Sequence, residues 1–266
     1  MSRVMFWRAL EDLRWTILWY ALGLSLYAVM ILSFYPTVRD NTAMMEQYIQ
    51  VLPKAVMEAF GVTDMASFSG FIGGEFLNVM WPLIVSIFLI MAGAAAVARE
   101  VEHGTIELLL SAPASRTRLL TAKLAALLAS TLALVAVTLG ALALGAALVD
   151  ETLELENLMA LGAVLVSFAV AVAGYSALFS SFSKERGKAA GMAAGLTIAF
   201  YLAWVVSELS EDWEWLNNLS IFAAYEPQRA LESRHLELWQ LGSLVGVGLV
   251  CAVAAIVIFR RRDAVP

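Results

Sequence analysis

The sequence has very few of the residues that form disulfides and transition-metal sites. Among 266 residues there are one cysteine, Cys251, and two histidines. A single cysteine excludes an intrachain disulfide, and so few thiolate and imidazole groups argue against a His/Cys metal site. The sequence also lacks a Gly-x-x-x-x-Gly-Lys-Ser/Thr, a His-Glu-x-x-His and a Gly-x-Ser-x-Gly run, which are motifs of nucleotide, zinc-hydrolase and serine-hydrolase sites. We therefore expect no catalytic residues, and neither a cofactor nor a metal held by this chain.

Charged residues are also scarce. They make up 15% of the chain, whereas hydrophobic residues make up 61%. Soluble domains average about 25% and about 45–50%, respectively. A water-soluble fold of this length cannot bury so much apolar surface, because surface-to-volume scaling limits the buried fraction. These proportions predict an integral membrane protein, and the net charge of −6 argues against nucleic acid as a partner.

Six long apolar runs predict six membrane-spanning helices. A helix needs about 20 residues to cross the hydrocarbon core of a bilayer. Barrel strands would be half as long and would alternate polar with apolar residues, which these runs do not do. We predict an all-α bundle that forms a single transmembrane domain over residues 1–266. The expected spans are residues 16–35, 76–98, 119–149, 157–183, 189–207 and 238–259.

The distribution of lysine and arginine predicts the orientation. Six spans place both termini on one side of the membrane, and that side holds 13 of the 17 Lys and Arg residues. Such an excess marks the cytoplasmic side. The loop at residues 150–156 contains four acids and no base, which suits the outer side. We therefore expect a multi-pass protein of a prokaryotic cell membrane with both termini in the cytoplasm.

The spans contain almost no ionisable groups. Lys123, at the start of the third, is the one Asp, Glu, Lys, Arg or His residue in the six spans. Ion-coupled carriers and intramembrane hydrolases keep such residues at mid-membrane, so both interpretations are weakened. Lipids and amphipathic drugs suit such a path better than bare ions, and an energy source must come from another chain. The polar residues left to line a path are Asn78, Ser86, Ser130, Thr131, Thr138, Ser167, Tyr175 and Tyr201.

The segment at residues 99–118, on the predicted cytoplasmic side, contains two helix-breaking residues. Gly104 can end the helix that leaves the second span, and Pro113 prevents a second short helix from continuing. Leu108-Leu109-Leu110 lie between them. An apolar patch with a charged rim is typical of a protein-docking surface; the alternative is that these leucines lie on the lipid. The residues expected to form the interface are Glu100, Glu102, Gly104, Thr105, Glu107, Leu108, Leu109, Pro113 and Arg116.

Two segments are expected at the membrane surface. Residues 1–15 place apolar and charged side chains on opposite faces of a helix, which is typical of an interfacial helix that leads into the first span as an elbow. Residues 208–237 combine acids with paired tryptophans and then an apolar stretch, which predicts a partly re-entrant outer loop.

The fifth span has a small residue at every fourth position. Such a stripe lets another helix approach closely. We favour packing within the chain, and a contact between subunits is the alternative. The stripe includes Gly187, Gly191, Gly195 and Ala199.

Residues 99–116 resemble a family signature. The stretch contains an acidic pair, Gly-Thr, Glu, a leucine run, and then Pro and Arg. It is similar to the cytoplasmic signature of permease subunits of ABC transporters of the type 2 export class. In that family the stretch forms the coupling helix, which sits in a cleft of the ATP-binding subunit. The family's six spans, cytoplasmic termini, elbow and re-entrant helices all have counterparts here, so the resemblance covers essentially the whole chain.

The resemblance implies a permease subunit rather than an enzyme. ATP and Mg would bind to a separate ATP-binding subunit present in two copies, and a second permease, identical or paralogous, would complete the transporter in membrane lipid. We expect export of a lipid, a drug-like molecule or another amphipathic substrate. Sodium or other ion export, or metal-site maturation, is the alternative within the class. Outside it, the alternatives are a membrane-integral enzyme and a non-transporting scaffold.

Overall fold

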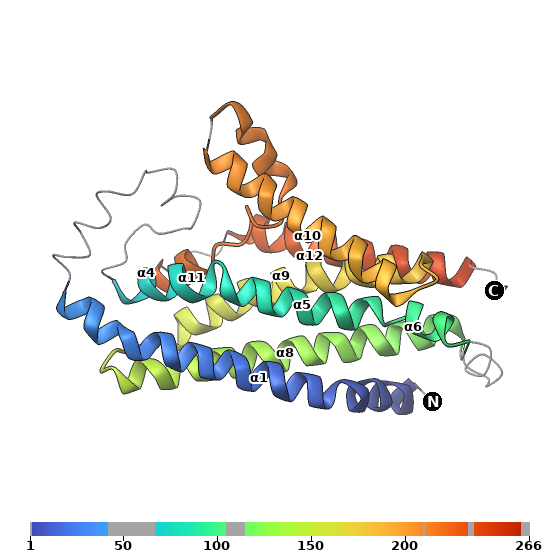
Figure 1. Ribbon diagram of the computed structural model, residues 1–266, viewed down its shortest axis with the longest axis horizontal. Coiled ribbons are helices and arrows are strands. Elements are labelled where there is room, and N and C mark those ends of the chain that lie inside the picture. Colours follow the sequence, from blue (N-terminus) through green and yellow to red (C-terminus); the bar gives the residue numbers. More distant parts are fainter. Residues whose placement is uncertain (1, 42–66, 105–114, 210, 234–236, 262–266) are drawn as a thin grey trace.

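The computed structural model describes residues 2–41, 67–104, 115–209, 211–233 and 237–261, and no strand occurs among them. The helices follow one another along the chain as a bundle of long spans with short helices at the ends (Figure 1). They are α1 (Ser2–Asp40), α4 (Phe68–Ile72), the π-helical η1 (Gly73–Leu77), α5 (Met80–Ala94), α6 (Ala98–Glu102), α8 (Arg116–Leu148), α9 (Leu155–Phe182), α10 (Arg186–Leu209), the 3-10 helix η2 (Glu211–Leu219), α11 (Pro227–Ser233) and α12 (Leu238–Arg261).

Six helical stretches are long and apolar enough to cross a membrane, which confirms the predicted all-α bundle. The shortest has 24 residues and the longest 38, all above the length that a hydrocarbon core requires. They are Arg3–Asp40, Phe68–Ala94, Arg116–Leu148, Leu155–Phe182, Arg186–Leu209 and Leu238–Arg261.

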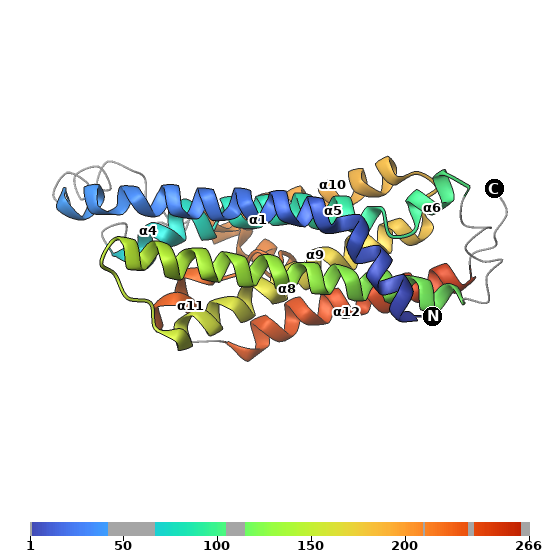
Figure 2. The ribbon, with the colours of Figure 1, turned by 90° about the horizontal axis from the view of Figure 1, so that it is seen from below.

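Helix α9 lies at the centre of the bundle. In its most apolar stretch 72% of the residues are buried, against 17% for α1, α10 and α12. It packs against α5, α8, α10, α11 and α12, whereas α1 runs beside α8 at the edge (Figures 1 and 2). Alanine, glycine and serine dominate the buried positions of α9, and small side chains let neighbouring helices approach from several sides.

The closest helix contact joins α9 to α12 through two glycines. A Cβ added to Gly248 would lie 2.5 Å from the carbonyl oxygen of Val170, and one added to Gly174 would overlap the backbone of Gly248. Real Cβ atoms do not approach a neighbouring backbone so closely. This contact therefore requires glycine at both positions.

The N-terminal segment is part of the first span. Residues 2–40 form one helix, α1, whose first part is turned away from the axis of the remainder (Figure 2). Trp7, Trp15 and Trp19 are all exposed on it, as aromatic residues at a headgroup layer would be. The interfacial elbow at residues 1–15 stays a prediction, because no bilayer defines the interface.

The second span differs from the expected single helix at residues 76–98. The helical run begins earlier, at Phe68, and it is interrupted by the π-helical turn η1 and again after Ala94. Pro82 lies just beyond η1 and has no N–H to continue a regular helical ladder. The second span is therefore an irregular helix near both of its ends, and only α5 between them is a regular α-helix.

The two chain ends lie at the same end of the bundle (Figure 1), and the loop between α8 and α9 lies at the other. This arrangement allows a direct test of the predicted orientation. In a Cys251→Ser background, a cysteine at the exposed Thr152 is expected to react with a membrane-impermeant maleimide in intact cells. A cysteine at the exposed Lys184, between α9 and α10, should react only after permeabilisation. The reverse pattern would show that the orientation is inverted.

Candidate functional site

A break in the second span is held open by a serine of the central helix. Helix α5 ends at Ala94 and α6 begins at Ala98. The buried Ser180 of α9 donates to the carbonyl of Ala94 at 2.7 Å, and its hydroxyl accepts from the amides of Val97 at 2.9 Å and Ala98 at 3.0 Å. Backbone groups that a helix would have paired internally are thus paired across helices, which removes the cost of the break.

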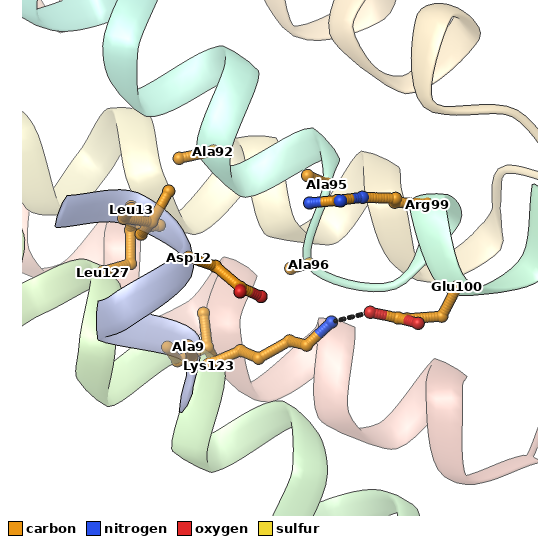
Figure 3. Close-up of a pocket in the computed structure, with 11 residues that line it drawn as sticks. Ala9, Asp12, Leu13, Ala92, Ala95, Ala96, Arg99, Glu100, Lys123 and Leu127 are labelled. Carbon is orange, nitrogen blue, oxygen red and sulfur yellow. Dashed lines mark hydrogen bonds and ion pairs between the residues drawn. The ribbon is translucent and has the colours of Figure 1, made fainter. Parts of the chain in front are cut away.

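Helix α6 is also joined to two other spans. The Glu100 carboxylate forms an ion pair with Nζ of Lys123 on α8, at a distance of 2.9 Å (Figure 3). The Glu102 carboxylate accepts from the backbone amide of Arg186, the first residue of α10, at 3.0 Å. Since only 23% of the Glu100 side chain and 20% of the Lys123 side chain are exposed, this pair is less screened than a surface ion pair. The short α6 is therefore fixed to α8, α9 and α10.

The structure describes the two ends of the predicted coupling segment. Gly104 has a φ of +67°, the left-handed conformation that ends a helix and that glycine adopts without strain. Ser115 precedes α8, and its hydroxyl accepts from the amide of Arg118 at 3.3 Å as an N-cap. Arg116 is the first residue of α8. The rest of the predicted interface, comprising Thr105, Glu107, Leu108, Leu109 and Pro113, lies outside the described residues.

A narrow pocket of about 60 Å³ lies beside the Glu100–Lys123 ion pair (Figure 3). Asp12 and Leu13 of α1 form one wall, and Arg99 lies across the pocket. The polar end of the N-terminal helix thus lies against the same junction as α6 and α8. A movement of α6 relative to α8 at this junction would therefore also displace α1.

Sequence reasoning missed Ser180, Lys123 and Arg186 as parts of this junction. Lys123 gave a usable signal, because it is the one charge within its expected span and acids precede it in the adjoining segment. Arg186 was grouped with the basic residues that set orientation. Nothing in the sequence around Ser180 distinguishes its hydroxyl from those of its neighbours.

The small-residue stripe on α10 does not pack within the chain as expected. Gly187, Gly191, Gly195 and Ala199 are all exposed. A Cβ built on any of the three glycines meets no described atom within 4 Å. The stripe faces outward because α10 contacts its neighbours through other residues, among them the buried Ala189, Ala193 and Thr197.

An aromatic cluster fills the opposite end of the bundle. The segment after η2 buries Phe222 and Tyr225 against Phe168 of α9, with ring centroids 5.2 and 4.6 Å apart. The hydroxyl of Tyr225 donates to the carbonyl of Leu77, the last residue of η1, at 2.8 Å. Burial raises the pKa of the Tyr225 phenol well above its usual value, so the group stays a neutral donor. The cluster ties the expected re-entrant region to α5 and α9.

The polar residues that were expected to line a path separate into two groups. Asn78, Ser86 and Tyr201 lie around one cavity between α5 and α10. The hydroxyls of Ser130, Thr131, Thr138 and Ser167 donate to carbonyls of their own helices, and Tyr175 bonds Thr197 at 2.6 Å. Within the described ranges, no group of three His, Cys, Asp or Glu residues could hold a metal ion.

Comparison with known proteins adds one match. A family model described as "ABC-2 family transporter protein" matches residues 13–264, nearly the whole chain. No curated protein matches the sequence.

Proposed function

The chain belongs to the ABC-2 family of transporter proteins, and from that premise we propose that it is a permease subunit driven by a separate ATPase. Family membership and the six apolar helices support a multi-pass membrane protein that acts as a transport subunit. The chain lacks a P-loop run, so the proposal places ATP and Mg on a partner chain. Both termini and the segment at residues 99–118 would face that partner in the cytoplasm.

The observation that supports this mechanism best is the set of bonds on α6. This helix of five residues is joined to α8 by Glu100, to α9 by Ser180 and to α10 by Glu102. A force applied just after Gly104 would therefore reach three spans at once. In this proposal the apolar residues Leu108 and Leu109 insert into a cleft of the ATPase, and α6 passes the motion of that subunit to the bundle.

The working transporter in this proposal contains two permeases and two ATP-binding subunits. ATP-driven closure of the ATPases would push both coupling segments and move the permeases between inward- and outward-facing states. The second permease is a further copy or a paralogue. The open stripe of Gly191, Gly195 and Ala199 on α10 suits contact with it, because small residues let helices from two chains approach closely.

The substrate in this proposal is an amphipathic molecule, such as a lipid or a drug-like compound. The cavity between α5 and α10 has mainly apolar walls. Apolar walls with a few hydroxyls solvate a hydrocarbon body better than a bare ion.

Co-expression with the P-loop ATPase of a neighbouring reading frame tests the proposal. We expect the two chains to co-purify, and we expect proteoliposomes that contain both to move an amphipathic dye only when ATP is added. A variant ATPase without its P-loop lysine is the matched control. If no P-loop protein co-purifies and the dye crosses without ATP, the chain is not a permease of this kind.

A further inference from the structure

Two cavities meet near the outer end of α5. The first, of about 210 Å³, lies between α5 and α10 and has apolar walls that include Leu83 and Ile198. The second, of about 370 Å³, is bordered by α10, η2 and α11. Both are lined by Asn78 and Phe222, so they adjoin at these side chains. Together their volumes fall within the range of about 300–1,000 Å³ that is usual for small-molecule sites.

The apolar cavity contains a hydroxyl without a hydrogen bond. Ser86 is 3% exposed, and its Oγ has no partner among the described residues. Every other serine or threonine that is buried in the described part of the chain makes a hydrogen bond, most of them to a carbonyl of their own helix. A buried hydroxyl without a partner is costly, so a hydrogen-bonding ligand would explain its place in this wall.

The apolar cavity is open at one side. Leu83 of α5 is 52% exposed and Ile198 of α10 is 58% exposed, and both line it. An apolar molecule could therefore enter between the two helices without crossing a polar barrier.

The second cavity is acidic. Among the described residues, Glu208, Glu226 and Glu232 line it together with one base, Arg229, for a formal charge of −2. Arg229 is already bonded to Glu226 at 2.8 Å. The side-chain oxygen of Asn217 also lines the cavity region, buried and without a partner among the described residues. This excess of acceptors and negative charge suits a cation and repels an anion.

Aromatic rings complete the polar cavity. Trp204 and Phe222 line it with their rings stacked, at a centroid distance of 6.4 Å and an interplanar angle of 24°. Tyr225 lines the same cavity. Ring faces attract organic cations, and most strongly where water is partly excluded.

From these observations we infer that the two cavities form one binding site for a cationic amphiphile, a molecule with an apolar body and an ammonium group. The body lies between α5 and α10 beside Ser86, and the ammonium lies among Glu208, Glu226 and the ring of Trp204. This inference rests on the proposed function, since it names the substrate class that the permease would carry.

Direct binding to the purified full chain in lipid nanodiscs tests the inference. The probe is rhodamine 6G, an apolar dye whose delocalised iminium charge stands in for the ammonium group, followed by fluorescence anisotropy, and fluorescein is its anionic counterpart. We expect saturable binding of rhodamine 6G and at least about ten-fold weaker binding of fluorescein. Glu208→Gln is expected to weaken rhodamine 6G binding about ten-fold, since a bond to a charged group is lost. Ser86→Ala is expected to weaken rhodamine 6G binding about three-fold, since the hydrogen bond between the serine hydroxyl and the ligand is lost.

Matched variants separate the site from general effects on the protein. Glu214→Gln removes an exposed charge of η2 that lines neither cavity, and it should leave binding unchanged. Ile198→Trp, at the open side of the apolar cavity, should block binding without touching a charge. The inference is overturned if Glu208→Gln and Ile198→Trp both bind rhodamine 6G like the wild type, or if fluorescein binds equally well.

The assay contains no ATPase and no ATP, so its outcome is independent of the proposed coupling. Binding of rhodamine 6G without ATPase co-purification would contradict the proposed function alone. ATPase co-purification and dye transport without selectivity for the cation would contradict this inference alone.

Discussion

Leu109→Asp is expected to leave the chain inserted in the membrane and to abolish co-purification of the ATPase. The substitution lies outside all six spans, so insertion should be normal. In the proposed contact it would bury a carboxylate in an apolar cleft, and an unpaired buried charge costs several kcal/mol. Central interface anchors contribute at least about 2 kcal/mol each, which corresponds to about a thirty-fold loss of affinity. The measurement is the yield of ATPase that co-purifies with a tagged permease.

Glu107→Ala is the matched control for this variant. It lies two residues away, and a charge at the rim of an interface contributes about 1 kcal/mol or less. Its ATPase yield should therefore stay close to that of the wild type. Wild-type ATPase yield and wild-type transport with Leu109→Asp would show that this segment is not the coupling element.

Gly248→Leu is expected to destabilise the fold of the single chain strongly. The new Cβ would lie 2.5 Å from the carbonyl oxygen of Val170, so α9 and α12 must separate or one of them must bend. Forcing extra atoms into a packed core costs about 1–3 kcal/mol, and this contact is with backbone, which cannot rotate away. We expect a loss of about 3 kcal/mol in the free energy of unfolding. Denaturant titration of the purified chain in mixed micelles measures it.

Gly246→Leu is the control in the same helix, because a Cβ at that position meets no described atom within 4 Å. Its free energy of unfolding should equal that of the wild type. The same is expected of Gly191→Leu and Gly195→Leu, whose positions are open on α10. If these two variants remain folded but associate less with a second permease, the stripe is a contact between chains. Equal stability of Gly248→Leu and Gly246→Leu would contradict the close α9–α12 contact.

The sequence was sufficient for the number of spans and for the helix end at Gly104, which depend on local composition. Uncharged runs of about 20 residues predicted six spans, since hydrocarbon excludes charge and demands paired backbone groups. Gly104 was placed correctly at a helix end, because a left-handed cap needs that residue type locally. The signature at residues 99–116 indicated the family that the whole-chain match then established.

Which surfaces meet was decided by the tertiary structure. The regular stripe of Gly191 and Gly195 is open, whereas Gly174 and Gly248, which belong to no such stripe, form the closest contact. Likewise Ser180 hydrogen-bonds to a helix break that lies more than eighty residues before it in the chain, and Ser86 has no partner among the described residues. Spacing along one helix defines a face, but the partner of that face depends on how the other helices pack, because in lipid every apolar face is equally well solvated. The sequence by itself therefore determined the spans and the caps, and the packing of the bundle determined the contacts and the cavities.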